Sequence, residues 1–276
     1  MIWQTSRFSI DLDRPQVMGI VNVTPDSFFD GGRNGTTAAA LRHCEQLLKD
    51  GADILDIGGE STRPGSPAVP LDEELARVVP LVSEAVALGV PVSVDTYKPA
   101  VMRAVLDLGA DIVNDIWALR QPGALGVVAE HPQCGVCLMH MHRDPQTMQT
   151  APMDGDVVSQ VLSFLELQAH NLMARGVEKT RILLDPGIGF GKTVEQNFAL
   201  LAKQDALLTA GYPLLAGWSR KSSLGVVTGW EVGQRMVPSV AAAVLAVERG
   251  ASVVRVHDVR ETVAALAVWS AMQRAG

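Results

Sequence analysis

Short runs rich in valine, isoleucine and leucine recur along the chain, and a stretch with helical spacing of its apolar residues follows each of them. Each run ends in a polar residue or a glycine. We predict eight strands, at residues 17–23, 53–57, 90–95, 111–114, 135–140, 181–185, 214–217 and 252–257. Nearly continuous apolar strands that alternate with helices are typical of a parallel sheet covered on both faces. Eight such units in about 250 residues favour a (β/α)8 TIM barrel over an open doubly wound sheet.

Start signals support two of the predicted helices. The acidic triplet at 72–74 suits the first turn of a helix, and Pro99 opens the segment 99–109. Before the barrel, residues 2–10 alternate in polarity, which predicts a short additional hairpin at the N-terminus. Because no linker or shift in composition divides the chain, we expect a single domain over residues 1–276.

Composition and charge exclude several classes of protein. The 276 residues are 47% hydrophobic and 19% charged, which excludes collagen, a coiled coil and a disordered tail. A net charge of −7 is opposite to the footprint of a nucleic-acid binder, so we expect no nucleic-acid partner. The longest apolar stretch, 236–247, is well short of the ~20 residues that span a bilayer. Charged residues interrupt any signal-peptide core near the N-terminus, and we expect a cytoplasmic location.

The three cysteines, Cys44, Cys134 and Cys137, are too few and odd in number for a disulfide framework. Cys134 and Cys137 have the spacing of a redox or zinc pair, which usually lies at a turn or a helix start. Here the pair runs into a predicted buried strand, where residues three apart face opposite sides. The pattern favours core thiols, with the redox and zinc interpretations left open.

In a barrel of parallel strands, catalytic residues lie at the carboxyl ends of the strands and in the loops that follow. This rule selects Asn22, Asp56, Asp95, Asn114, His140, Asp185, Lys221, Arg255 and His257. Arg255 and His257 are two apart on one predicted strand, so both side chains should face the same way. Such a mixed set of polar groups suits an anionic ligand that also carries a heterocycle.

The segment 185–193 ends in the Gly-Lys-Thr of a P-loop, but neither nucleotide-binding pattern is complete. A Walker A loop needs a glycine where Pro186 stands, and a dinucleotide fingerprint needs one where Lys192 stands. Two alternatives remain. The glycines at 187, 189 and 191 let the backbone approach a flat ligand at the end of the sixth strand, or they form a plain tight turn.

Two histidines near the end of the fifth strand, His140 and His142, could bind a metal ion. Such a site needs further ligands at other strand ends, where His257 is the single additional histidine, so the pattern favours no histidine metal site. Nearby methionines can fill the core or form a flexible wall for a planar ring. These are Met139, Met141 and Met148.

Two loops on the same rim lack any regular pattern, at residues 24–32 and 58–67. The first contains the adjacent pair Phe28 and Phe29, which cannot both be buried easily in a loop. The second contains Arg63 among glycines and prolines. Both are candidate flaps over a bound substrate, although Arg63 can also be a plain solvated arginine.

Seven segments resemble the dihydropteroate synthase family, in the family's order and over nearly the whole chain. They are MGIVNVTPDSF at 18–28, DIGGESTRPG at 56–65, VDT at 94–96, VND at 113–115, LDPGIGFGK at 184–192, SRK at 219–221 and VRVHD at 254–258. The resemblance implies a transferase of folate biosynthesis. That family joins 6-hydroxymethyl-7,8-dihydropterin pyrophosphate to 4-aminobenzoate, and releases pyrophosphate and 7,8-dihydropteroate. It works with Mg²⁺ and is the target of sulfonamides.

Carried over residue by residue, the resemblance implies three groups of substrate-binding residues. The pterin would be bound by Asp95, Asn114, Ile116, Met139, Asp185, Phe190, Gly217, Lys221 and Arg255. The pyrophosphate would be bound by Asn22, Arg63, Arg255 and His257, with Asn22 also reaching the magnesium ion. The aminobenzoate would be bordered by Phe28, Thr62, Pro64 and Ser222. The catalytic group would be Arg63, Asp95, Lys221, Arg255 and His257.

The implied chemistry needs no general base. An aryl amine is already neutral at pH 7, and none of the residues assigned to the aminobenzoate is an obvious base. We therefore expect catalysis to act on the departing pyrophosphate. Carbon–oxygen cleavage should run ahead of carbon–nitrogen bond formation, with the pterin substrate bound first.

One departure and two alternative functions stay open. Arg143 stands where the family often has a glycine after the fifth strand, so the shape of that loop is in question. The first alternative is a pterin-binding barrel that carries methyl groups to a corrinoid protein, and the second is a non-catalytic barrel. Retention of Arg63, Lys221 and His257 argues against both. The family also implies a homodimer, with the helix at 239–247 as a plausible contact.

Overall fold

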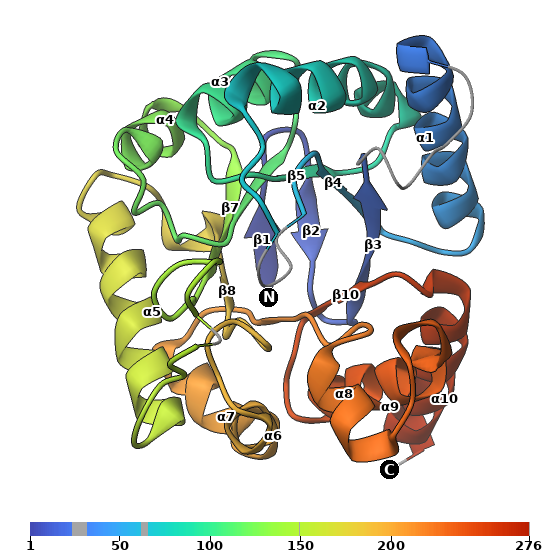
Figure 1. The fold of residues 1–276 in the computed structure, drawn as a ribbon, viewed down its shortest axis with the longest axis vertical. Coiled ribbons are helices and arrows are strands. Elements are labelled where there is room, and N and C mark those ends of the chain that lie inside the picture. Colours follow the sequence, from blue (N-terminus) through green and yellow to red (C-terminus); the bar gives the residue numbers. More distant parts are fainter. Residues whose placement is uncertain (24–31, 62–65, 149, 276) are drawn as a thin grey trace.

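Eight parallel strands form the centre of the molecule in a computed structural model that describes residues 1–23, 32–61, 66–148 and 150–275 (Figure 1). They are β3 (Gln16–Asn22), β4 (Ile54–Gly58), β5 (Val92–Asp95), β6 (Ile112–Asp115), β7 (Gly135–Met139), β8 (Ile182–Asp185), β9 (Leu215–Ala216) and β10 (Val253–Val256). Their order is β8-β7-β6-β5-β4-β3-β10-β9, and a parallel bridge between Leu184 and Leu214 brings the two ends of the sheet together. The predicted barrel is confirmed, with strand ends shifted by one or two residues.

Helices surround the strands (Figure 1). They are α1 (Gly32–Lys49), α2 (Leu71–Ala85), α3 (Pro99–Asp107), α4 (Ala124–Glu130), α5 (Val157–Met173), α6 (Val194–Ala202), α7 (Gln204–Leu207), α8 (Ser222–Thr228), α9 (Met236–Glu248) and α10 (Val259–Ala275). Short 3-10 turns lie at Val86–Leu88, Lys179–Arg181, Leu208–Ala210 and Val232–Gln234. None of the described helices is both long enough and apolar enough to cross a membrane.

The local start signals act as expected. The acidic triplet lies in the first turn of α2, and Pro99 is the first residue of α3. Thr193 and Gln196 form a capping box at the start of α6, which fixes where the loop after β8 ends. Of the predicted flap at 24–32, the structure describes only Gly32, which is the first residue of α1.

The predicted N-terminal hairpin closes the amino end of the barrel. Its strands β1 (Ile2–Gln4) and β2 (Ser9–Asp11) are antiparallel. Trp3 is fully buried, packs in one cluster with barrel residues such as Met18 and Ile54, and donates its indole N–H to the carbonyl of Arg181 at 3.0 Å. Burial of a tryptophan in this way contributes on the order of 2–3 kcal/mol. The hairpin therefore completes the core at this end.

All three cysteines are buried and free. Cys134 packs in the cluster between the sheet and the helices, whereas Cys137 packs inside the barrel with the hairpin. The two side chains thus face opposite sides of β7, as the strand geometry predicts. The interpretation as core thiols is confirmed.

Candidate active site

Four polar side chains from four strands meet at the carboxyl end of the barrel. Arg255 on β10 donates from Nε to Asp56 Oδ2 at 2.6 Å and from Nη2 to Asp95 Oδ2 at 2.8 Å. Asn114 on β6 donates from Nδ2 to the same Asp56 oxygen at 3.2 Å. Asp56 is fully buried, and Asp95 and Asn114 nearly so. The strand-end rule predicts this convergence, because the parallel register brings these positions to one edge.

The cluster leaves hydrogen-bonding capacity unused. Oδ1 of Asp56 and Oδ1 of Asp95 are both buried and have no hydrogen-bond partner. Burial raises the pKa of Asp95 to about 7, and the guanidinium of Arg255 acts in the opposite direction. For Arg255, burial opposes the charge, but Asp56 and Asp95 together raise its pKa. Two carboxylates around one guanidinium, each with a free acceptor, form a site for a ligand with N–H donors.

Asp185, the last residue of β8, adds a third buried carboxyl group. Its Oδ1 accepts a hydrogen bond from the backbone N–H of Gly187 at 2.7 Å, and burial raises its pKa. Gly217 follows β9, and a Cβ placed on it would lie 4.0 Å from Asp185 Oδ2. Position 217 therefore lies in van der Waals range of this carboxyl group.

An apolar cluster lies between the loops that follow β6, β7 and β8. Its buried members are Ile116, Met139, Met141, Met148 and Phe190, with Tyr97 and Trp117 packed against them. The ammonium of Lys221 lies 4.3 Å from the centroid of the Phe190 ring. Apolar walls with a cation and buried carboxylates nearby are suited to a flat, polar-edged ring.

His257 lies one residue past β10, which ends at Val256 rather than at His257 as expected. Its Nδ1 is 2.9 Å from Oγ of Ser219, and its backbone N–H donates to the same oxygen at 3.1 Å. Ser219 therefore orients the histidine. The neighbouring Arg220 forms an ion pair with Asp258 at 2.6 Å, which ties the loop after β9 to the end of β10.

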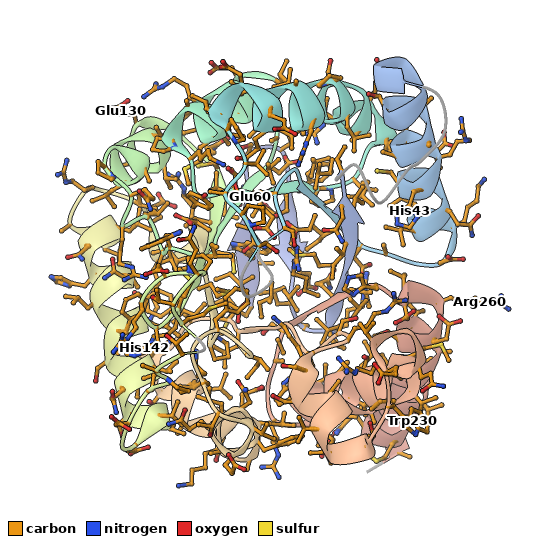
Figure 2. The ribbon with its side chains drawn as sticks, viewed as in Figure 1. His43, Glu60, Glu130, His142, Trp230 and Arg260 are labelled. Carbon is orange, nitrogen blue, oxygen red and sulfur yellow. The ribbon has the colours of Figure 1, made fainter. Side chains whose placement is uncertain are left out.

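Other predicted substrate-binding residues lie around this rim. Asn22 is the last residue of β3, beside Gly58 of β4, and Ser222 is the exposed first residue of α8. Phe28, Thr62, Arg63 and Pro64 lie outside the described residues. Figure 2 shows Glu60, which lies two residues before the undescribed segment 62–65, near the middle of the view, whereas Glu130, Arg260 and Trp230 lie at the periphery.

His140, the first of the two histidines after β7, lies among packed side chains. His140 is buried, and its ring packs edge-on against Phe164 with 4.9 Å between centroids. Burial lowers its pKa to about 2, so it is neutral. Within the described part of the chain, no group of three or more histidine, cysteine or acidic side chains could hold a metal ion.

The glycine-rich segment after β8 is a tight turn packed against the end of β7. Gly187 has a φ of 68°, and a Cβ there would lie 1.9 Å from the carbonyl oxygen of His140. A Cβ on Gly189 would lie 3.2 Å from Cδ of Lys221. The tight-turn alternative therefore holds at Gly187, while Gly189 leaves room for a predicted substrate-binding lysine.

Sequence reasoning selected Asp56 without giving it a role, missed Ser219, and left the shape of one loop open. Asp56 satisfies the strand-end rule, but the family resemblance gave it no role, although it holds both Arg255 and Asn114. Ser219 lies in a motif of that resemblance without an assignment of its own. Arg143 adopts a φ of 62°, the left-handed conformation that favours glycine, so the loop has a glycine-like backbone without a glycine.

Known proteins are similar to this chain over almost its full length. The sequence model described as "pterin binding enzyme" matches residues 18–257. The dihydropteroate synthase of Neisseria meningitidis serogroup B is 50% identical, over 98% of this chain and 97% of that protein. Two crystallised relatives are each 53% identical. The Burkholderia cenocepacia dihydropteroate synthase complexed with 7,8-dihydropteroate superposes with a TM-score of 0.91, covering 99% of this chain and 97% of that one. The Xanthomonas albilineans dihydropteroate synthase with 4-aminobenzoic acid superposes with a TM-score of 0.90, covering 96% and 95%.

Proposed function

The chain belongs to the dihydropteroate synthases among the pterin-binding enzymes, and from this premise we propose how its residues carry out the reaction. The activity is a transferase reaction of folate biosynthesis that joins 6-hydroxymethyl-7,8-dihydropterin pyrophosphate to 4-aminobenzoate and releases pyrophosphate. The observation that carries the residue assignments is the set of buried, unpaired carboxylate oxygens at the barrel mouth. Because a pterin presents several N–H donors along one edge, it is complementary to that set.

Pterin binding is assigned to the carboxyl groups and the apolar cluster. Asp185 and Asp95 accept hydrogen bonds from ring and amino N–H groups, and Asn114 pairs with the mixed donors and acceptors of the ring edge. Met139 and Phe190 cover the faces of the ring, with Lys221 beside Phe190. A ligand bound this way gives the buried, unpaired Oδ1 of Asp95 a hydrogen-bond donor.

Pyrophosphate binding is assigned to Arg255, His257, Arg63 and Asn22. The two hydrogen bonds between His257 and the Ser219 hydroxyl support this role for His257, because they hold its ring at the rim. The donor chemistry at Asn22 also fits Mg²⁺. This ion commonly takes one or two protein oxygens and completes its octahedron with substrate phosphates and water, so a single amide oxygen on β3 is sufficient. When bound, magnesium would neutralise charge on the departing pyrophosphate.

The order of bond changes follows from the absence of any need for a base. Negative charge from Asp95 and Asp185 stabilises the positive charge that is shared between the pterin ring and its exocyclic methylene when the carbon–oxygen bond breaks. The neutral aryl amine then attacks the methylene and loses its proton to water. A large secondary deuterium isotope effect at the methylene with a small nitrogen effect supports this order. The reverse pattern indicates concerted attack.

The proposed function is tested with pure protein, the pterin pyrophosphate, 4-aminobenzoate and Mg²⁺. We expect equal amounts of pyrophosphate and 7,8-dihydropteroate. Asp185→Asn is the matched variant, because its amide presents a donor where the ligand also presents donors. It should weaken pterin binding by about 2 to 5 kcal/mol in calorimetry. Pterin binding without product formation would instead favour the methyl-carrying or non-catalytic barrel.

A homodimer through α8, α9 and α10 is also proposed. Exposed large apolar side chains gather on these elements and the turn between α8 and α9: Val226, Val227, Trp230, Val232, Met236, Val237, Leu245, Val268 and Met272. Exposed apolar side chains on neighbouring helices of this kind mark an interaction site, and a second copy of the chain is the occupant that we propose. Sedimentation should give a dimer that Val237→Glu converts to a monomer. A monomer for the unaltered chain would contradict this assignment.

A further inference from the structure

The lysine of the Gly-Lys-Thr segment is enclosed by its own loop. Lys192 is 3% exposed, although lysine is rarely buried. Its Nζ lies 2.9 Å from the carbonyl oxygen of Gly187 and 3.2 Å from that of Phe190. On the other side it lies 2.9 Å from Nδ1 of His140 and 3.4 Å from the carbonyl oxygen of the same residue. The ammonium therefore joins the loop after β8 to the end of β7.

All of these contacts are with uncharged acceptors. An ammonium has three N–H donors, so the four nearby acceptors saturate it. His140 is neutral, and its Nδ1 can accept from the ammonium in the tautomer that carries the proton on Nε2. Burial lowers the pKa of Lys192 to about 7, and the charge of nearby Asp185 opposes that shift. Carbonyl dipoles thus hold this cation, and no N–H remains for a nucleotide phosphate.

Both segments that Lys192 joins also carry the site. The loop after β8 begins directly after Asp185 and contains Phe190, and His140 directly follows Met139. The backbone N–H of His140 donates to the carbonyl of Asp185 at 2.9 Å, so the two strand ends are already paired there. A longer backbone hydrogen bond, from the N–H of His142 to the carbonyl of Phe190 at 3.5 Å, joins the same segments. The Lys192 ammonium adds contacts to the carbonyls of both Gly187 and Phe190.

We propose that Lys192 is a positioning residue for pterin binding, whose ammonium holds the loop after β8 on the end of β7 and so sets the distance between Phe190 and Met139. This inference rests on the proposed function, because it assigns those two side chains to the faces of the pterin ring. The two lysines of the rim then have different roles. Lys221 lies beside the Phe190 ring, whereas Lys192 supports the backbone that carries that ring.

The first test is Lys192→Met, which keeps much of the side-chain volume and removes the donors. Pterin affinity is measured by calorimetry with 7,8-dihydropteroate, and the Michaelis constant for the aminobenzoate substrate is measured at saturating pterin pyrophosphate. We expect the pterin Kd to rise about tenfold or more, and the Michaelis constant for aminobenzoate to change less than about twofold. Lys203→Met, at the exposed end of α6, is the matched control and should change neither value. An unchanged pterin Kd, or equal weakening of both substrates, would overturn the inference.

A second pair of variants keeps the lysine and alters its partner. Asparagine at 140 can place Oδ1 near the position of the imidazole Nδ1, whereas leucine offers no acceptor. We expect His140→Leu to raise the pterin Kd about tenfold and His140→Asn to stay within about threefold of the unaltered enzyme. Equal values for the two variants would count against Lys192 even if Lys192→Met did not fold. Failure of the unaltered protein to bind 7,8-dihydropteroate would overturn the proposed function itself, and this inference with it.

Discussion

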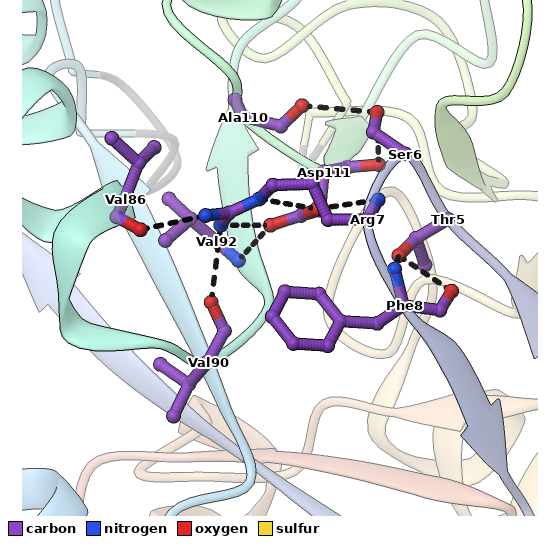
Figure 3. A network of polar contacts seen from close by, with 9 residues as sticks. All are labelled: Thr5, Ser6, Arg7, Phe8, Val86, Val90, Val92, Ala110 and Asp111. Carbon is purple, nitrogen blue, oxygen red and sulfur yellow. Dashed lines mark hydrogen bonds and ion pairs between the residues drawn. The ribbon is translucent and has the colours of Figure 1, made fainter.

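The two ends of the barrel hold buried aspartates in opposite ways. At the amino end, Asp111 is fully buried and all of its lone-pair directions are used (Figure 3). Oδ1 accepts from the backbone N–H and Nε of Arg7, and Oδ2 accepts from Nη2 of Arg7 and the N–H of Val92, all at 2.6–3.1 Å. At the carboxyl end, Asp56 and Asp95 each keep one buried oxygen without a partner.

The difference shows which end is complete without a ligand. The Arg7 guanidinium also donates to the carbonyls of Val86 and Val90, which precede β5. The hairpin, this segment and the start of β6 therefore share one network in which the buried carboxylate has all its hydrogen bonds. An unsatisfied buried acceptor costs about 1–3 kcal/mol. Of these three aspartates, the two that carry such an acceptor, Asp56 and Asp95, both lie at the carboxyl end of the barrel. The same end carries the strained backbone. Within the described residues, the non-glycine residues with positive φ are Ala118, Leu119, Arg143 and Arg220, in loops that follow β6, β7 and β9.

The largest expected loss of stability comes from breaking the ion pair between Arg7 and Asp111. Arg7→Met leaves the Asp111 carboxylate buried with two of its four donors, and should lower the free energy of unfolding by about 2 to 4 kcal/mol. The partial exposure of Arg7 places the value at the lower end of that range. Urea denaturation measures the loss. The kcat/KM for both substrates should be unchanged at temperatures where the variant is folded, and a lower value would show that the amino end contributes to catalysis.

Asp56→Asn is the corresponding change at the mouth. The amide oxygen can still accept from one donor, but Arg255 loses a charged partner and can turn away from its present position. We expect the pterin Kd to rise by an amount equal to about 2 kcal/mol. The free energy of unfolding should stay the same or rise, because a buried carboxylate with an unpaired oxygen is removed. Equal stability losses in Asp56→Asn and Arg7→Met would erase the distinction between the two ends.

The pH dependence of stability should also come from the mouth. Burial raises the pKa of Asp95 from 3.8 to about 7 in the folded enzyme, so between these values the folded state holds a proton that the unfolded state has lost. Stability is therefore highest below about pH 4 for this group, and declines as the pH rises to about 7. Between pH 5 and pH 8 we expect the unaltered enzyme to lose about 2 to 3 kcal/mol of its free energy of unfolding through this group, and Asp95→Asn to remove that loss in urea denaturation. Parallel curves for the two proteins would place the titration elsewhere.

The fold was predictable where local patterns decide it. Apolar runs predicted each strand, because a strand covered on both faces must be apolar throughout. The closing of the barrel was harder, because β9 has two residues and joins β8 through the bridge at Leu184 and Leu214. Strand-end residues could be selected, but the contact of Asp56 with Arg255 could not, since 199 positions separate them. The sequence placed Lys192 in an incomplete nucleotide-binding motif. Its contacts depend on the path of the loop around it, which the sequence does not show.

Arg143 gives the smallest expected effect and tests whether the strain at the mouth can be relieved. A left-handed φ of 62° costs a non-glycine residue about 1 kcal/mol. Glycine removes this strain, but its greater freedom in the unfolded chain returns about half of the gain. Arg143 is exposed and its nearest polar contact is the 3.4 Å approach to the His142 ring, so little else is lost.

We therefore expect Arg143→Gly to raise the free energy of unfolding by about 0.5 kcal/mol. Arg143→Ala is the control, because it removes the same side chain and keeps the left-handed strain, and it should give no gain. The difference between the two variants, measured by thermal and urea denaturation, isolates the backbone contribution. If alanine stabilised as much as glycine, the cause would be the arginine side chain rather than the φ angle. A gain from glycine alone, with lower pterin affinity, would show that the strained loop holds the end of β7 in its binding geometry.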